Sequence, residues 1–234
     1  MNAYIDFHTH ILPGIDDGSP DTGTSLAMIA KLAEQGVGKI VLTSHYYSDE
    51  LPMEEYLLRR DAAFEELLPR CPAGIDLIPA SATFVTEYIF NNADLRPLCV
   101  GARYLLTEWP YTSSFTGRSA RQLERLQSDY GLTPIIAHVE RYPALIGDRA
   151  KLEDLAEAGC LFQINLASLR SRGTRRVLTR LISDGLIHLV GTDCHNLTTR
   201  PPEYQPGIEW IEKKCGSRAV ERLIEKAEAL LQPD

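Results

Sequence analysis

Residues 4–19 read YIDFHTHILPGIDDGS, a short apolar segment that runs into a turn rich in histidine and aspartate. The segment YIDFH, residues 4–8, predicts a β-strand, and His8 and His10 stand at its end. Because side chains alternate between the two faces of a strand, a His-x-His pair points both imidazoles the same way, so both can reach one metal ion. Two solvated loop histidines give the same pattern, so the pair alone does not decide between a metal site and a polar loop.

Six more short apolar segments follow along the chain, and amphipathic segments separate them. Together with 4–8, the predicted strands are 39–45, 76–81, 104–109, 133–139, 160–166 and 187–193. They are rich in Val, Ile and Leu without polar alternation, which is typical of parallel strands buried on both faces. The predicted helices cover 21–36, 53–68, 119–131, 149–159, 174–185 and 217–231. This alternation predicts an α/β fold around a parallel sheet, open or closed into a barrel, and residues 1–234 are expected to form one domain.

Composition excludes several classes of protein. The chain has 32 acidic and 24 basic residues, a net charge of -8, which argues against a protein that coats nucleic acid or anionic membrane. No apolar run approaches the roughly 18 residues that a membrane span needs. The five cysteines show no paired spacing and favour a reducing compartment, so a cytoplasmic location is expected.

Polar side chains gather at the ends of the predicted strands, where an α/β fold places its active site. Beyond the His-x-His pair, they are His45, Glu108, His138, Asp193 and His195. This set offers nitrogen and oxygen ligands without thiolates, which suits Mn, Zn or Fe in a catalytic site better than a structural zinc. Asp16 or Asp17 adds a carboxylate, although GIDDGS is also typical of a plain turn before a helix cap. Two or three ions close together would hold a phosphoryl group and lower the pKa of a bridging water for in-line attack.

Two arginines follow these candidate ligands along the chain. Arg141 comes shortly after His138, and Arg200 after Asp193, and guanidinium groups are natural bidentate partners of phosphate oxygens. A solvated surface arginine is the alternative at each position. Cys194 and Arg200 also satisfy Cys-x5-Arg, the pattern of thiol-dependent tyrosine phosphatases, but residues 195–199 contain no glycine to aim backbone N–H groups at a phosphate. Cys194 is therefore predicted to face away from the metals and to pack in the core.

Other notable residues are expected to be structural. Asp6 is predicted to support the first strand and its ligands from behind, and His188 stands at the start of a strand instead of its end. The basic run SLRSRGTRR, residues 168–176, is interpreted as the solvated start of a helix, with attraction of acidic, tyrosine-rich tails as the alternative.

The ordered set IDFHTH, DDGS, TSHYY, TEWP, AHVERY and GTDCHNLTTRPP resembles the PHP (polymerase and histidinol phosphatase) superfamily. Within it, the chain is most similar to the bacterial metal-dependent tyrosine-protein phosphatases of capsular and extracellular polysaccharide operons, from Asp6 to about Pro202. The resemblance implies a distorted (β/α)7 barrel of the TIM-like, PHP type, with residues 1–234 as one catalytic domain. It also implies Mn as the usual metal and phosphotyrosine as the substrate, chiefly that of a cytoplasmic tyrosine kinase that controls polysaccharide export.

The resemblance further implies which residues bind which ion. By motif, His8, His10 and Asp193 correspond to the ligands of a first ion, Glu108 and His138 serve a second, and Asp17, His45 and His195 a third. The glutamate that bridges the first two ions in the family corresponds to Thr83 in the stretch PASATFVTEY. Three outcomes are open: Glu87 reaches into the site, water bridges instead, or the second ion binds weakly and activity falls.

The leading hypothesis is a Mn-dependent phosphomonoesterase that acts on phosphotyrosine in proteins, with Arg141 and Arg200 in contact with the phosphoryl group. One alternative is a small-molecule phosphatase of the same superfamily, such as a histidinol phosphatase. A third hypothesis is a metal-binding regulatory protein whose turnover is impaired at Thr83. A bacterial tyrosine kinase is the expected partner, nucleic acid is not, and an oligomer is compatible with the sequence.

Overall fold

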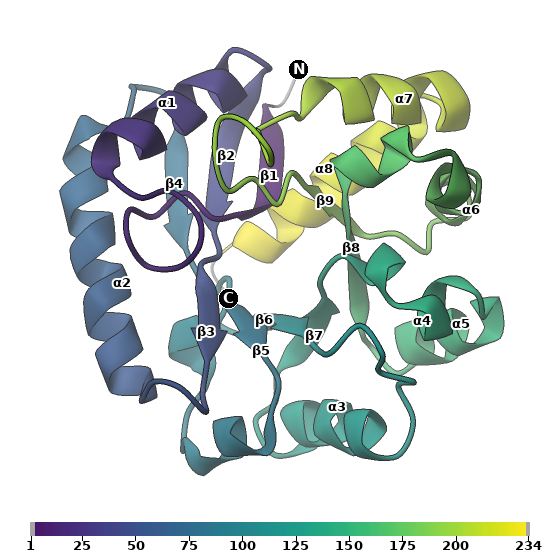
Figure 1. Cartoon of the computed structure of the whole chain (residues 1–234). Helices are drawn as coiled ribbons and strands as arrows, with labels where there is room; N and C mark the ends of the chain where they lie inside the picture. Colours follow the sequence, from purple (N-terminus) through teal and green to yellow (C-terminus); the bar gives the residue numbers. More distant parts are fainter. Residues whose placement is uncertain (1–2, 233–234) are drawn as a thin grey trace.

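Parallel strands form the centre of the molecule in a computed structural model, which describes residues 3–232 (Figure 1). The first sheet has the order β1-β2-β4 and the second β3-β5-β6-β7-β8-β9, and every pair of neighbouring strands is parallel. The strands are β1 (Tyr4–Thr9), β2 (Val37–Leu42), β3 (His45–Tyr47), β4 (Asp76–Pro79), β5 (Ala82–Phe84), β6 (Tyr104–Glu108), β7 (Thr133–Ile136), β8 (Leu161–Asn165) and β9 (Leu189–Gly191).

Backbone hydrogen bonds join the two sheets into a closed barrel. The predicted second strand, 39–45, is split into β2 and β3. The predicted third strand, 76–81, corresponds to β4, and β5 follows directly after its predicted end. The Ala82 amide donates to the Ser44 carbonyl across the break between the two sheets. At the other junction, the Asp193 amide donates to the His8 carbonyl at 2.8 Å and the His10 amide to the Cys194 carbonyl at 2.9 Å. The seven predicted strands therefore occupy seven consecutive positions around a barrel, and the predicted α/β barrel is confirmed.

Helices surround the barrel, and the six that the sequence predicts are present with ends shifted by a few residues. The helices are α1 (Thr22–Ala33), α2 (Met53–Leu67), α3 (Arg118–Ser128), α4 (Pro143–Ile146), α5 (Arg149–Glu157), α6 (Arg172–Ser183), α7 (Gln205–Cys215) and α8 (Ser217–Leu231). Asp21 caps α1, because its carboxylate accepts from the Thr24 amide at 2.8 Å. The short α4 and the longer α7 are additional to the prediction.

The apolar core has two layers, one inside the barrel and one between barrel and helices. Phe7, Val41, Ala82 and Leu106 belong to the interior layer. Ala227 and Leu230 of α8 also belong to it, so this helix covers the end of the barrel at which the strands begin, and in Figure 1 it passes close to β1 and β9. The opposite end, where the strands finish, is left for polar side chains.

Candidate metal centre

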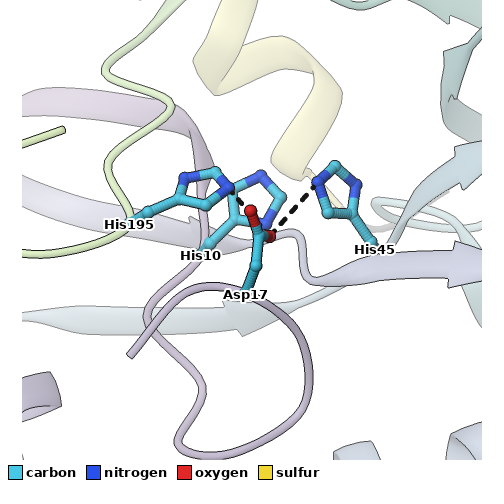
Figure 2. Close-up of side chains that lie close together, drawn as sticks. All are labelled: His10, Asp17, His45 and His195. Atoms are coloured by element: carbon cyan, nitrogen blue, oxygen red, sulfur yellow. Dashed lines mark ion pairs between the residues drawn. The ribbon is translucent and has the colours of Figure 1, made fainter. Parts of the chain in front are cut away.

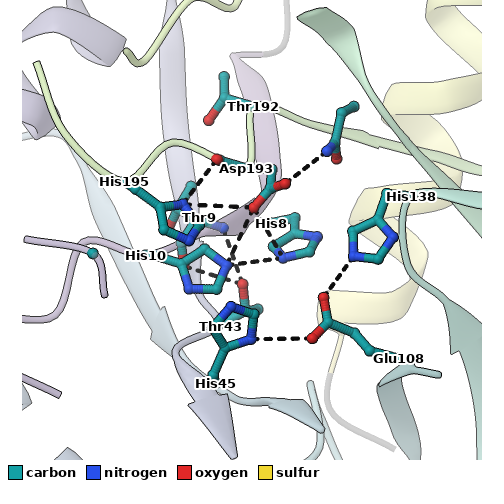
Figure 3. A network of polar contacts seen from close by, with 12 residues as sticks. His8, Thr9, His10, Thr43, His45, Glu108, His138, Thr192, Asp193 and His195 are labelled. Carbon is teal, nitrogen blue, oxygen red and sulfur yellow. Dashed lines mark hydrogen bonds and ion pairs between the residues drawn. The ribbon is translucent and has the colours of Figure 1, made fainter. Parts of the chain in front are cut away.

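The predicted ligand residues all lie together at the carboxyl end of the barrel. Two groups have ligand atoms within 4.8 Å of one another: one is His10, Asp17, His45 and His195, and the other is His8, His10 and Asp193. Figure 2 shows the first group, with the Asp17 carboxylate directed at His45 and His195. Glu108 and His138 lie beside the two groups (Figure 3), since the Glu108 carboxylate is 2.5 Å from His138 Nε2 and 3.0 Å from His45 Nδ1.

His10 occurs in both groups, but it has only one nitrogen available. Its Nδ1 lies 2.6 Å from the Asp16 carboxylate and is occupied by that hydrogen bond. Its Nε2 lies 3.1 Å from His8 Nε2 and 3.3 Å from Asp193 Oδ1. Because one lone pair can bind one ion, His10 belongs with His8 and Asp193, which leaves Asp17, His45 and His195 as the second group.

Asp193 is the most heavily contacted carboxylate of the site. It adopts a left-handed backbone conformation with φ of 55°, as does His138 with φ of 33°, a strain that non-glycine residues accept where the surrounding structure holds them. Arg141 donates to Asp193 Oδ2 at 2.7 Å and Arg200 to Oδ1 at 2.8 Å. Both predicted arginines therefore lie at the edge of the cluster, within reach of a group bound there.

The protonation states of His8, Asp193 and Glu108 suit metal ligands, whereas His10 is protonated without metal: burial lowers its pKa, but Asp16 and Asp193 outweigh burial and raise the pKa to about 10. Burial lowers the pKa of His8 to about 3, so its imidazole is neutral at neutral pH. Burial alone would raise the pKa of Asp193, but His8, His10 and Arg141 outweigh it and hold the pKa well below its usual range. The same balance, with His138 and His45 as partners, keeps the pKa of Glu108 well below its usual range. Deprotonated carboxylates beside neutral imidazoles are the forms that bind divalent ions.

The types of ligand atom in the cluster also fit divalent metal ions. His195 Nε2 is fully buried without a hydrogen-bond partner and lies 3.2 Å from Asp17 Oδ1, so both atoms could bind the same divalent ion. The neighbouring donors are imidazole nitrogens and carboxylate oxygens without a thiolate, a combination typical of Mn, Zn or Fe sites.

The side of β5 that faces the metal cluster differs from the sequence-based expectation. Thr83 pairs in register with Tyr46 and Thr107, and Tyr46 belongs to the outer apolar layer. Ala82 pairs with His45 and Leu106 and belongs to the interior layer. Since alternate residues of a strand face opposite ways, Ala82 and not Thr83 faces the metal cluster. The assignment of Thr83 to a position facing the metal cluster is therefore wrong, and the inward residue beside His45 is Ala82, which offers only a methyl group.

Glu87 does not compensate for the missing carboxylate. Its Oε1 accepts from the Gln122 side chain at 2.9 Å, and its Oε2 pairs with Arg125 at 3.4 Å. Its side chain is 54% exposed on the outside of the molecule, so the first of the three outcomes considered for this site is excluded in this conformation.

Two polar residues of β8 belong to the site although the sequence analysis did not select them. Gln163 Oε1 accepts from the His138 amide at 2.8 Å and lies 3.1 Å from His8 Nδ1, so it orients two candidate ligands. The Asn165 side chain donates to Asp193 at 2.7 Å. Their signal in the sequence was two amide side chains within an otherwise apolar strand, which must find hydrogen-bond partners when buried.

A pocket of about 430 Å³ opens onto the metal cluster. Its lining residues are Asp17, His45, Tyr47, Phe84, Glu108, Trp109, Pro110, Tyr111, His138, Arg141 and Arg200. The Tyr47 and Phe84 rings lie 5.7 Å apart, and Tyr111 stands over His138 with a centroid distance of 5.7 Å. The pocket thus combines charged groups with aromatic side chains.

The residues that were expected to be structural are not among the candidate metal ligands. Cys194 is fully buried in the outer apolar layer, and burial raises the pKa of its thiol well above the usual range. Asp6 accepts from the Thr192 amide at 2.9 Å and hydroxyl at 2.6 Å, and so links β1 to the segment that precedes Asp193. His188 Nδ1 accepts from the Phe162 amide at 3.0 Å. In the basic run, Arg175 stacks on Trp210 of α7, and Arg170 pairs with Glu203.

A closed parallel barrel with histidines and carboxylates at its carboxyl end defines a metal-dependent hydrolase of the α/β-barrel class. The phosphotriesterase homology protein from Escherichia coli shares this fold, with a TM-score of 0.59 and 13% identity over 98% of this chain and 99% of that chain.

The sequence model of the family described as "Capsular polysaccharide synthesis, CpsB/CapC" matches residues 4–232, and the chain belongs to this family. The tyrosine-protein phosphatase YwqE of Bacillus subtilis is 30% identical over 97% of this chain and 91% of its own length. The tyrosine-protein phosphatase CpsB of Streptococcus pneumoniae is 29% identical over 94% of both chains. A structure from work on YwqE and CpsB, described as unique metal-dependent tyrosine phosphatases, has a TM-score of 0.82 and covers 97% of this chain and 94% of that chain.

Proposed function

We propose that this protein is a metal-dependent tyrosine-protein phosphatase, with residues 1–234 as a single PHP-type catalytic domain. The observation that carries the proposal is the pocket in which the imidazole and carboxylate cluster, Arg141 and Arg200 meet aromatic side chains. The named activities of the relatives YwqE and CpsB support the same function.

The residues of the cluster, some of which line the pocket, have separate roles in the proposed hydrolysis of a phosphate ester. Divalent ions, when bound, supply a water of lowered pKa and offset charge on the phosphoryl group. We propose that His8, His10 and Asp193 hold one ion, that Asp17, His45 and His195 hold another, and that Glu108 and His138 serve a further one. The ion set is proposed to be two or three Mn ions.

Arg141 and Arg200 are proposed to bind the phosphoryl oxygens. Each donates to Asp193 and lines the pocket, so the two guanidinium groups are held at the edge of the cluster. Arginine is suited to this because its planar group presents parallel N–H donors to two oxygens at once.

The aromatic lining favours an aryl ester. Tyr47, Phe84 and Tyr111 provide ring faces and edges at the pocket, where a tyrosine ring attached to a bound phosphate would pack. A phosphoserine places only a short aliphatic stem there. We therefore propose phosphotyrosine in a protein as the substrate, with a bacterial tyrosine kinase of polysaccharide export, in the cytoplasm, as the physiological partner.

No helix in residues 3–232 is both long and apolar enough to cross a membrane.

The proposal is tested with purified protein, Mn²⁺ and matched phosphotyrosine and phosphoserine peptides. We expect faster release of phosphate from the phosphotyrosine peptide, loss of activity with a chelator, and recovery when Mn²⁺ is restored. The Cys194→Ser variant should retain the activity, because the thiol is buried away from the pocket. Activity that survives the chelator but is lost in Cys194→Ser would refute the metal-dependent proposal.

A further inference from the structure

Asp16 lies at the centre of the loop between β1 and α1 and makes three hydrogen bonds through its carboxylate. Oδ2 lies 2.6 Å from His10 Nδ1 and accepts from the His45 amide at 2.8 Å. Oδ1 accepts from the Gly18 amide at 3.0 Å. The side chain is only 5% exposed, so water does not replace these contacts readily.

The first contact sets the orientation of one ligand. A hydrogen bond to a carboxylate holds the proton of His10 on Nδ1, which leaves the Nε2 lone pair directed at His8 and Asp193. Without this acceptor, the imidazole is free to rotate or to carry its proton on Nε2, where it blocks metal binding.

The hydrogen bonds that Asp16 accepts from the His45 and Gly18 amides position the second group of ligands, which is Asp17, His45 and His195. The bond from the His45 amide fixes the first residue of β3, whose imidazole faces the cluster. The bond from Gly18 closes the turn that carries Asp17, whose carboxylate lies 3.6 Å from His45 Nε2 and 3.2 Å from His195 Nε2.

Gly18 shows how closely this turn is packed against the first group. A Cβ at this position would lie 2.2 Å from the His10 carbonyl oxygen and 2.8 Å from Asp16 Oδ1. The turn therefore packs directly against the backbone of His10, and the Ser19 amide also donates to the His10 carbonyl at 3.0 Å.

We propose that Asp16 is a positioning residue that sets the geometry of both ligand groups at once and is not itself a ligand. Its carboxylate belongs to neither of the two groups whose ligand atoms lie within 4.8 Å of one another, and it contacts them instead through N–H donors of His10, His45 and Gly18. It couples the His8, His10 and Asp193 group to the Asp17, His45 and His195 group through one buried carboxylate. The inference rests on the proposed metal centre, but its test measures metal binding and does not depend on phosphatase activity.

The test compares Asp16→Ala and Asp16→Asn with two control variants. Asp17→Asn weakens a proposed ligand, and Asp21→Ala removes a carboxylate of the same loop that caps α1 and does not contact the cluster. Each protein is stripped of metal and titrated with Mn²⁺ by equilibrium dialysis, with the bound metal counted by elemental analysis and the Tm recorded.

We expect Asp16→Ala to weaken Mn²⁺ binding by about 10-fold to 100-fold in every binding step, because supporting partners of ligands typically contribute that much. Asp16→Asn should bind Mn²⁺ better than Asp16→Ala, since its amide oxygen can still accept from His10 Nδ1. Asp17→Asn should affect one binding step, and Asp21→Ala should lower the Tm without changing the Mn²⁺ affinity.

A nuclear magnetic resonance measurement gives a second readout that general destabilisation does not produce. In the Zn²⁺-loaded protein, the His10 Nδ1–H proton should give a hydrogen-bonded signal that Asp16→Ala loses and Asp16→Asn keeps. Unchanged Mn²⁺ affinity and an unchanged His10 signal in Asp16→Ala would overturn the proposal. Loss of one whole Mn²⁺ equivalent in Asp16→Asn, as in Asp17→Asn, would show instead that Asp16 is a ligand.

Discussion

A carboxylate introduced at position 82 should strengthen metal binding, whereas the same change at position 83 should only destabilise the fold. Ala82 faces the cluster and pairs in register with His45. Neighbouring strands lie about 5 Å apart, so a glutamate at position 82 reaches the ions that His45 and Glu108 are proposed to bind. Thr83 faces the outer layer beside Tyr46, on the side of the sheet away from the metal cluster.

The expected gain in Mn²⁺ binding free energy is the difference between the Coulomb attraction of the new carboxylate to the ion and the cost of removing that carboxylate from water. At an effective dielectric constant of about 20, a carboxylate about 4 Å from a divalent ion gains roughly 8 kcal/mol of Coulomb energy. Removing the carboxylate from water offsets most of this gain, because the cost of burying one ion is several kcal/mol. We expect a net gain of about 2 kcal/mol, which is about 30-fold in the Mn²⁺ dissociation constant.

The assay is Mn²⁺ titration of metal-free protein, with stoichiometry measured by elemental analysis. Ala82→Gln serves as the control, because it adds the same volume without the charge. We expect Ala82→Glu to bind Mn²⁺ more tightly than Ala82→Gln, and to raise the stoichiometry if an ion binds weakly in the natural protein. Ala82→Asp, which is smaller, tests the same position if the longer side chain prevents folding.

Thr83→Glu provides the matched comparison. A charge buried without a partner should lower the free energy of unfolding by about 3–5 kcal/mol and leave Mn²⁺ affinity unchanged. If Thr83→Glu tightens Mn²⁺ binding and Ala82→Glu does not, the assignment of the two faces of β5 is refuted.

Three further predictions concern other parts of the structure. Arg141→Lys should lower kcat/KM for a phosphotyrosine peptide by about 30-fold, because losing a charge-assisted hydrogen bond costs about 2 kcal/mol. Burial, reinforced by Lys226, lowers the pKa of His188 to about 4, so the neutral form stabilises the fold above pH 6.5. That stability, at most about 3 kcal/mol, is lost as the pH falls from 6.5 to 4, and His188→Gln should remove this part of the pH dependence in denaturant unfolding. Tyr142→Phe removes the buried hydroxyl that accepts from the Trp109 amide, and should lower the Tm by about 6 °C in a thermal melt.

The barrel and most of the proposed ligand set were predictable because both depend on local patterns. Short apolar segments separated by amphipathic ones indicate parallel strands and helices, and a parallel barrel brings the ends of its strands together. His8, His10, Glu108, His138 and Asp193 could therefore be selected before their distances were known. The exact strand ends were less predictable, since Asp193 and His138 lie in strained turns just after their strands.

The assignment of faces within β4 and β5 was not predictable in the same way. A strand buried on both sides carries apolar residues on each face, so the pattern PASATF does not reveal whether position 82 or 83 faces inward. The answer depends on pairing with β3 and β6, which are distant in sequence. Glu87 illustrates the same limit, because its partners Gln122 and Arg125 lie on another helix.

The sequence by itself determined the alternation of strands and helices and the types of donor available for a metal. These follow from residue chemistry and from the period of a strand or a helix. Only the tertiary structure decided that Asp16 supports the ligands while Asp17 faces the cluster, and that Ala82 occupies the inward position beside His45. Adjacent residues of one segment point in different directions, and contacts with distant segments determine which of them reaches the site.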